Sequence, residues 1–247
     1  MSTRVEPVSE AVLVERAVAL ILSRAGQPRP DHSRPDHSRP DRSHPDDPSP
    51  EGRARSGASR SIKQASSDAP VRVLVDGHPS SRPERLADSL VTALEATGHP
   101  VVRVRVEDFL RPRSLRLERG HADPESLLDG WIDVGALNRE VLHRAVERRE
   151  YLPSLRDPVT DRATRATYAS VAPGAVVLLD GALAIGRGLA LDVSIHLALK
   201  AATIRRRTPE DQVWSVSAYE QYAQEIARLP DLTALVDHPD RPAIAHG

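Results

Sequence analysis

The segment from Val71 to Leu90, VRVLVDGHPSSRPERLADSL, constrains the fold more than any other part of the 247-residue chain. It begins with a β-branched run, VRVLVDG, which ends at Gly77 and is typical of a buried strand. It continues as PERLADSLVTALEATGH, in which leucines recur every four residues and Gly98 ends the pattern, as in an amphipathic helix. A strand, a glycine-bearing turn and a helix in this order predict an α/β fold.

Further apolar strands alternate with helices from Val71 to the C-terminus. The predicted strands are Pro100–Phe109, Gly174–Leu183 and Leu189–Leu199, with a late short strand and tail in 232–244. Predicted helices lie within 127–150, 200–211 and 215–230. Strands that are apolar throughout and alternate with helices indicate a parallel sheet that helices cover on both faces.

Composition divides the chain into three regions, 1–26, 27–70 and 71–247. The first contains a helix from Val8 to Ala25, with Glu10 and Glu15 early, Arg24 late and Gly26 as its stop. Its apolar face is wide, so we expect this N-terminal helix to pack against another part of the protein.

The second region is a linker built on a decaying repeat of five residues, R-P-D-H-S. It has almost no large apolar side chains, so it cannot bury enough surface to offset its ordering entropy, and we predict disorder. The repeated His32, His37 and His44 also suggest metal binding. We favour a solvated linker, because no rigid scaffold would fix the geometry of such ligands.

Charge and cysteine content exclude several classes of function. The formal net charge is −1, which gives no electrostatic basis for a nucleic-acid or membrane partner. Cysteine is absent, so no disulfide or thiolate zinc site can form. The first residues lack the pattern of a signal peptide, and the longest apolar run, Ala17–Leu22, is too short to span a bilayer. We therefore expect a cytoplasmic protein.

In parallel α/β sheets, ligands bind at the carboxyl ends of the strands. This rule selects three segments as the candidate site: Asp76–Ser81, Glu107–Arg113 and Asp180–Ala182.

Several short motifs occur in an order that resembles a known family. They are VLVDG at the first strand, VEDFLRPRSLR, LPSLRDPVTDRATR, VVLLDGAL, LDVSIHLAL with TIRRR, and LVDHPDRP near the end. Together they resemble the P-loop kinases of the uridine kinase type, especially the actinobacterial branch, over residues 71–247. The resemblance implies a three-layer P-loop kinase-like fold, ATP and Mg²⁺ as cofactors, and phosphoryl transfer to a nucleoside-like small molecule.

The resemblance also assigns roles to individual residues. The catalytic carboxylate falls on Glu107 by register, with Asp108 directly after it, and Asp180 is the candidate Mg²⁺ ligand. Nucleotide or phosphate binding falls on Asp76, Gly77, His78, Ser80, Ser81, Arg82, Arg85, Arg205 and Arg206. Substrate binding falls on Arg111, Arg113, Asp157, Asp161, Arg165 and Tyr168. Trp131 could supply a stacking face.

The chain departs from the family at the phosphate loop, which reads G-x-x-x-x-G-K-[ST]. Counted from Gly77, the second glycine, the lysine and the hydroxyl are replaced by Arg82, Pro83 and Glu84. A Cβ at position 82 crowds the path of the backbone, and proline cannot neutralise phosphate charge. Glu84 could hold Mg²⁺ in place of the hydroxyl, but it would also repel a triphosphate.

Two interpretations of this loop remain open. Pro79 and Pro83 lack N–H donors for an anion, whereas Arg82 and Arg85 could restore positive charge from another geometry. Alternatively the loop is a plain connection, with Pro83 at the first helical position and Ser81 as the helix cap. We favour the plain connection.

Three functional hypotheses follow. The first is a uridine kinase-like protein with weak or lost activity that keeps the fold and a small-molecule pocket. The second is an active small-molecule kinase in which arginines rebuild the ATP site. The third is a non-catalytic binding or scaffolding protein, tethered through the repeat and without a small-molecule ligand. Whether the backbone near His78–Arg82 can bind an anion separates the first from the second.

Overall fold

A single seven-stranded sheet organises the computed structural model, which describes residues 4–25, 68–238 and 241–246. The predicted linker, 27–70, lies outside these residues except for its last three positions. The strands are β1 (Arg4–Pro7), β2 (Val71–Gly77), β3 (Val101–Arg105), β6 (Val176–Gly181), β7 (Val193–Ala198), β8 (Leu232–Leu235) and β9 (Ala243–His246). A separate small hairpin pairs β4 (Glu150–Tyr151) with β5 (Ala169–Ser170).

The strand order is β1-β9-β8-β7-β2-β6-β3. The five strands from β8 to β3 are parallel, as the apolar strand pattern predicted. Strands β9 and β1 add an antiparallel edge that the sequence analysis did not anticipate. They join the two ends of the chain, with Arg4 beside His246.

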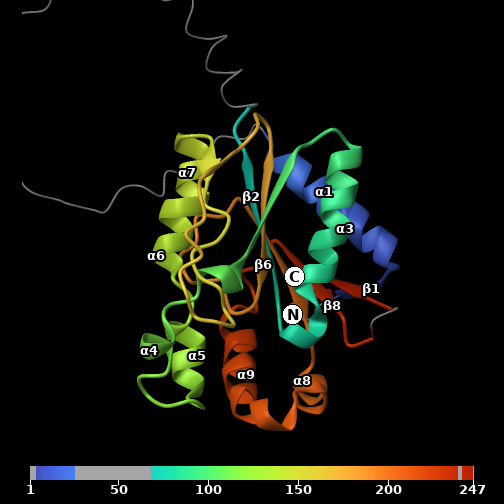
Figure 1. Ribbon diagram of the computed structural model, residues 1–247. Coiled ribbons are helices and arrows are strands. Elements are labelled where there is room, and N and C mark those ends of the chain that lie inside the picture. Colours follow the sequence, from blue (N-terminus) through green and yellow to red (C-terminus); the bar gives the residue numbers. More distant parts are fainter. Residues whose placement is uncertain (1–3, 26–67, 239–240, 247) are drawn as a thin grey trace, which may run out of the picture.

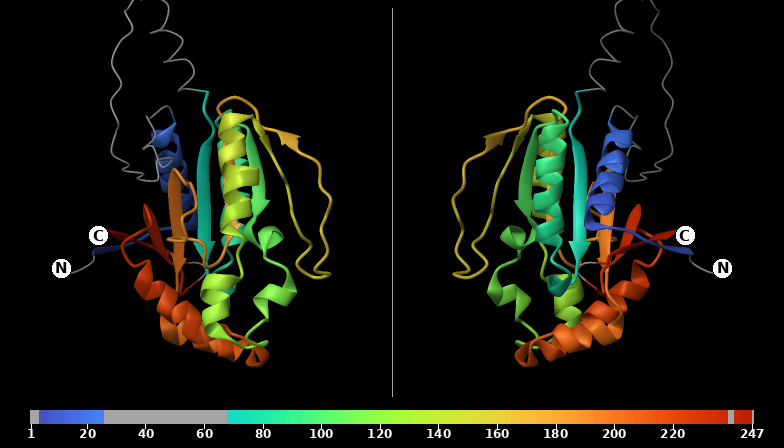
Figure 2. Two further views of the ribbon diagram at one scale, coloured as in Figure 1. Left: turned by 90° about the vertical axis from the view of Figure 1, so that its left-hand side faces the viewer. Right: turned by 90° about the vertical axis from the view of Figure 1, so that its right-hand side faces the viewer.

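Helices cover both faces of the sheet, as expected (Figures 1 and 2). One face carries α1 (Glu10–Arg24) and α3 (Pro83–Ala96), and the other carries α6 (Val134–Ala136), η3 (Leu137–Leu142) and α7 (His143–Glu147), which follow one another directly. The carboxyl end of the sheet carries α4 (Arg113–Arg116), α5 (Pro124–Gly130), α8 (Ala201–Arg207), η4 (Glu210–Ser215) and α9 (Val216–Glu225). None of the helices in the described part of the chain is long and apolar enough to cross a membrane.

Two strands are shorter in the structure than the apolar runs predicted. The run from Pro100 forms β3 only as far as Arg105, and Val106–Phe109 turns into a short 3-10 helix, η2. The run from Leu189 joins the sheet only at Val193. Both differences change where side chains lie at the edge of the sheet. Glu107 and Asp108 in particular lie in a helical turn and not on a strand.

Helix α1 packs into the same core as α3 and the sheet. Ser9 caps its first turn by accepting a hydrogen bond from the backbone N–H of Val12. Leu13, Ala17 and Ile21 recur every four residues and are buried. Their core also contains Leu90 of α3, so the predicted packing of the N-terminal helix is confirmed.

We predict that this contact is required for stability. Replacing Ile21 with Ala should lower the free energy of unfolding by about 2–5 kcal/mol, because it leaves a cavity beside a fully buried position. Urea denaturation measures the change. The control is Arg16→Ala on the exposed face of α1, which should change the free energy by less than about 0.5 kcal/mol. Equal stability of the two variants would mean that α1 does not pack as described.

Candidate functional site

A cleft of about 720 Å³ lies where β2, β3 and β6 end, at the edge of the sheet that the strand rule selected. Gly181 allows η2 to pack closely against the end of β6, because a Cβ there would lie 2.6 Å from the Cβ of Val106. One wall is apolar and includes Trp131, which lies 6.1 Å from Trp214 between ring centroids. The charged residues of the cleft are Glu84, Asp88, Arg103, Arg105, Glu107, Asp108 and Asp180.

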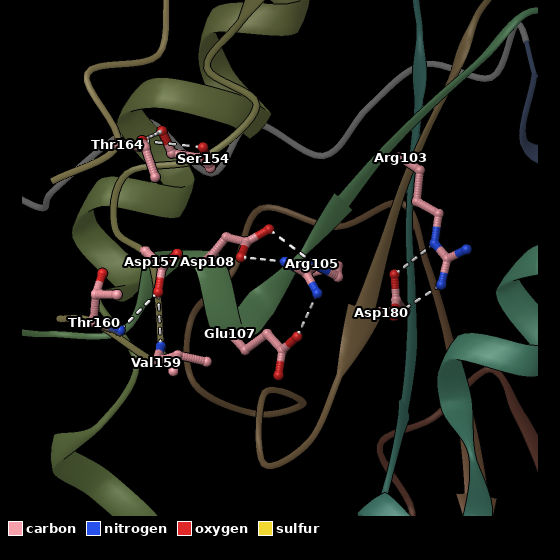
Figure 3. Close-up of polar contacts among 10 residues, drawn as sticks. All are labelled: Arg103, Arg105, Glu107, Asp108, Ser154, Asp157, Val159, Thr160, Thr164 and Asp180. Atoms are coloured by element: carbon pink, nitrogen blue, oxygen red, sulfur yellow. Dashed lines mark hydrogen bonds and ion pairs between the residues drawn. The ribbon is translucent and has the colours of Figure 1, made fainter. Parts of the chain in front are cut away.

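Asp180 forms a two-pronged ion pair with Arg103 of β3 (Figure 3). The Arg103 Nε donates to Oδ1 at 2.8 Å and Nη2 donates to Oδ2 at 3.2 Å, and the same guanidinium also contacts Asp88. Hydrogen bonding to Asp180 raises the pKa of Arg103 above its ordinary value. Both oxygens of the candidate Mg²⁺ ligand are therefore engaged by a permanent cation.

A second arginine holds the two candidate catalytic carboxylates. Arg105 donates to both oxygens of Asp108, at 3.0 and 2.7 Å, and lies 2.8 Å from an oxygen of Glu107 (Figure 3). Asp108 is buried, whereas Glu107 is exposed. The hydrogen bond to Asp108 raises the pKa of Arg105. Both carboxylates line the cleft from η2, so either could face a ligand there.

The cleft is acidic overall. Its lining contains five carboxylates against two guanidiniums, and neither lysine nor histidine adds to the positive side. An anion entering this space would meet net repulsion, whereas a neutral or cationic molecule would not.

Across the described residues, no group of three or more His, Cys, Asp or Glu side chains is arranged to hold a metal ion. In this conformation Asp180 and Asp108 instead direct both of their carboxylate oxygens to Arg103 and Arg105.

The loop after β2 uses its own hydrogen-bond donors internally. The N–H of Ser80 donates to Nδ1 of His78 at 3.1 Å, that of Ser81 to the His78 carbonyl at 2.7 Å, and that of Arg82 to the Pro79 carbonyl at 3.1 Å. Pro79 has no N–H to offer. A phosphate-binding loop works by pointing such groups at the anion, so in this conformation the loop does not form an anion nest.

His78 is uncharged at neutral pH in this arrangement. Burial, and then the nearby positive charge of Arg207, lower its pKa to about 4. The neutral ring accepts at Nδ1 from the N–H of Ser80 and lies 2.7 Å from the Ser80 hydroxyl. Its edge packs on Tyr219, with ring centroids 4.4 Å apart. His78 therefore closes the loop through its side chain.

Helix α3 begins at Pro83, as the plain-connection interpretation predicted. Arg82 precedes it with φ of 57°, a left-handed conformation, and no side chain caps the helix. The predicted cap at Ser81 is wrong, because its hydroxyl donates to the carbonyl of His78 at 2.7 Å. Gly77 is required at the start of the loop, since a Cβ there would collide with the Ser81 hydroxyl oxygen.

The arginines of α8, two of which were predicted to bind nucleotide phosphate, lie on two faces of the helix. Arg205 and Arg206 are exposed, and Arg205 forms an ion pair with Glu220. Arg207 instead faces the loop and donates to the carbonyls of Asp237 at 2.6 Å and Ser80 at 3.5 Å. The sequence analysis did not select Arg207. Helical spacing could have found it, because it follows the buried Ile204 by three positions.

Asp76 lies behind the cleft and not in it. It is fully buried, and its two oxygens accept from the backbone N–H of Ala184 and from Nδ1 of His196, both at 2.9 Å. Burial, followed by the charge of Asp76, raises the pKa of Tyr222 in the same cluster. Asp76 therefore connects β2, β7 and the segment after β6.

The six predicted substrate residues do not line the cleft. Asp161 accepts from the backbone N–H of Arg113 at 3.0 Å, which lowers the pKa of Asp161. Asp157 accepts from two backbone N–H groups of its own turn, as Figure 3 shows. Tyr168 donates to Glu140 at 2.8 Å. Arg111 and Arg165 are exposed. The side chains of Asp157, Asp161 and Tyr168 therefore stabilise the segments around the cleft. Pro153, in the same region of the chain, lines the cleft.

Comparison with known proteins supports the fold. No family model and no curated protein sequence matches the chain. Among solved structures, one described as a possible uridine kinase from Bacillus stearothermophilus is 17% identical, with a TM-score of 0.54, over 67% of this chain and 88% of that one. A second, described as a candidate fructose transport system kinase from Silicibacter sp. TM1040, is 19% identical, with a TM-score of 0.53, over 89% and 98%.

The chain therefore has the α/β fold of P-loop kinases. Both structures share this fold, which agrees with the P-loop kinase-like fold that the order of the motifs predicted.

The state of His78 leads to a pH-dependent prediction. Its folded pKa of about 4 lies below the ordinary 6.5, so the neutral ring stabilises the fold above pH 6.5. This stabilisation should be lost progressively as the pH falls from 6.5 toward 4. Urea denaturation of the wild type and of His78→Asn at several pH values would test it. The difference in the free energy of unfolding between the wild type and His78→Asn should be constant above pH 6.5 and should change below it. A constant difference down to pH 4 would contradict the prediction.

Proposed function

We propose that this protein is a uridine kinase-like protein without effective phosphoryl transfer, which binds a neutral, nucleoside-like small molecule in the acidic cleft. The observation that carries the proposal is the hydrogen bonding of the loop His78–Arg82. Three of its backbone N–H groups donate to acceptors within the loop itself. This selects the first of the three hypotheses from the sequence.

The residues of the phosphate loop do not support binding of a phosphate donor such as ATP. Pro83 and Glu84 stand where a lysine and a hydroxyl would contact phosphate and metal. Removing one preorganised donor from a transition state commonly costs on the order of 10²–10³ in rate. Loss of several such groups together argues for activity far below that of an ordinary kinase.

The metal side argues in the same direction. Mg²⁺ needs oxygen ligands with free lone pairs in near-octahedral geometry. Asp180 gives both oxygens to Arg103, and Asp108 gives both to Arg105. Each guanidinium supplies positive charge to its carboxylate without a metal ion.

The acceptor side retains the features of a binding pocket. The cleft is large enough for a nucleoside-sized molecule and joins charged groups at the sheet edge to an apolar wall that includes Trp131. An aromatic ring can stack on a flat base, and carboxylates can accept from sugar hydroxyls. The excess of negative charge disfavours nucleotides relative to uncharged nucleosides.

Tryptophan fluorescence provides the first test, because both tryptophans of the chain, Trp131 and Trp214, lie beside the cleft. Uridine should quench or shift the emission of the wild type and of Trp214→Phe, in which Trp131 is the only reporter. The affinity should be the same with EDTA and with Mg²⁺. In parallel, incubation with Mg-ATP and uridine should give no UMP above the protein-free rate.

Two outcomes would overturn the proposal. UMP formation that disappears in Asp108→Asn would show an active kinase. Failure of uridine and of other nucleosides to change the fluorescence at millimolar concentration would remove the ligand-binding part. Binding of UMP as tightly as uridine would contradict the electrostatic argument.

The pairing of Arg103 leads to a separate prediction about metal binding. Replacing Arg103 with Met should release Asp180 and Asp88, which contact the same guanidinium, and leave two adjacent carboxylates without a cation. The variant should gain measurable Mn²⁺ binding by calorimetry or paramagnetic resonance, whereas the wild type should show none at the same concentration. The double variant Arg103→Met with Asp180→Asn should lose the gain. Equal Mn²⁺ binding by wild type and Arg103→Met would show that Arg103 does not take the place of a metal ion.

A further inference from the structure

A row of three polar side chains crosses the middle of the sheet beneath α9. The register pairs Asp76 of β2 with His196 of β7, and pairs His196 in turn with Thr233 of β8. Residues in register on adjacent strands project from the same face of a sheet. This face is the one that α9 covers, because the ring of His196 packs edge-on against Tyr222, with centroids 6.2 Å apart.

Asp76 fixes the orientation of the His196 ring. Oδ2 of Asp76 lies 2.9 Å from Nδ1 of His196, and both residues are buried. An ionised carboxylate only accepts hydrogen bonds, so Nδ1 carries a proton and donates it to Asp76. In the neutral ring, Nε2 is then a hydrogen-bond acceptor that is directed away from Asp76.

Two polar groups of this row have no partner within the chain. In the described ranges, neither Nε2 of His196 nor the hydroxyl of Thr233 forms a hydrogen bond with another residue. Neither atom is among the polar atoms that are sealed from solvent without a partner. Although His196 is only 9% exposed, its Nε2 is therefore accessible to a small molecule.

These groups line a cavity of about 100 Å³ between α9 and the ends of β7 and β8. Most of the remaining wall is apolar, and includes Leu199, Ile204, Ala223, Ile226 and Pro230. An engineered cavity of about 150 Å³ in another protein holds benzene, so this smaller space suits a body of about five non-hydrogen atoms.

The two polar groups select the chemistry of the occupant. An alcohol hydroxyl can donate to Nε2 of His196 and accept from the hydroxyl of Thr233 at the same time. A ketone can only accept, so it leaves Nε2 without a donor. A carboxylate or an ammonium group would lose its hydration against the apolar wall.

We propose that this cavity binds a small uncharged alcohol, with its hydroxyl between His196 and Thr233 and its alkyl body against α9. Asp76 acts as the positioning residue, since it fixes which nitrogen of His196 faces the ligand. The site goes beyond the proposed function, because the cavity contains none of the carboxylates of the acidic cleft and requires neither a nucleoside nor a nucleotide.

The test is a titration of the full chain with 2-butanol, followed by saturation-transfer NMR of the ligand. Binding should be saturable in the millimolar range, as expected for about five non-hydrogen atoms. The ketone 2-butanone has the same carbon skeleton without the O–H donor, and should bind about three- to tenfold more weakly. Thr233→Val removes one hydroxyl and keeps the branched shape, and should weaken 2-butanol binding by a similar factor.

A matched pair of variants tests the location. Ala223→Leu fills the cavity and should abolish binding, whereas Ala202→Leu, on the exposed face of α8 and outside the cavity, should bind as the wild type does. Thermal melts would show that each variant is folded, and Thr233→Val keeps the test decisive if Ala223→Leu is not.

Three results would overturn the proposal. The first is no saturable binding of 2-butanol by the wild type at about 100 mM, since even an inefficient ligand of this size would then bind. The second is equal affinity for the alcohol and the ketone. The third is equal affinity of the wild type and Thr233→Val, or of folded Ala223→Leu and Ala202→Leu, which would place the alcohol elsewhere on the protein.

Discussion

The closure of the loop after β2 by His78 is the interaction on which the functional interpretation depends. An N–H group can point at a ligand or at a neighbouring acceptor, but it cannot satisfy both fully. Here the imidazole of His78 takes the N–H of Ser80, and carbonyls take those of Ser81 and Arg82. Gly77 allows the tight approach that this closure needs. The strand-turn-helix unit that forms a phosphate cradle in P-loop proteins thus satisfies its own hydrogen-bond donors in this chain.

Two arginines on β3 likewise occupy carboxylates of the cleft that could otherwise bind a metal ion. Arg103 and Arg105 flank Val104 on β3. Each forms an ion pair with a carboxylate that lines the cleft, Arg103 with Asp180 and Arg105 with Asp108. A guanidinium is always charged and fixes its partner in one geometry, whereas Mg²⁺ exchanges and must be recruited together with phosphate. A guanidinium in place of a bound Mg²⁺ ion still supplies positive charge to the neighbouring carboxylates.

The sequence predicted the parallel sheet and its covering helices because those elements follow local apolar patterns of sufficient length. It missed β1 and β9, which have only four residues each and pair across almost the whole chain. It located the cleft through the strand-end rule but did not predict that Asp76 lies behind the cleft. Apolar strands buried on both faces carry no alternation to show which way a polar residue points. The Arg103–Asp180 pair required the order of β3 and β6 in the sheet, which no local pattern contains.

The loop after β2 separates the acidic cleft from a cavity in which arginines outnumber carboxylates. The arginines of that cavity, Arg82, Arg85 and Arg207, come from the loop, from α3 and from α8. The carboxylates of the cleft come instead from α3, η2 and β6. An anion that entered the cleft would therefore be repelled by these carboxylates, whereas an uncharged molecule would not.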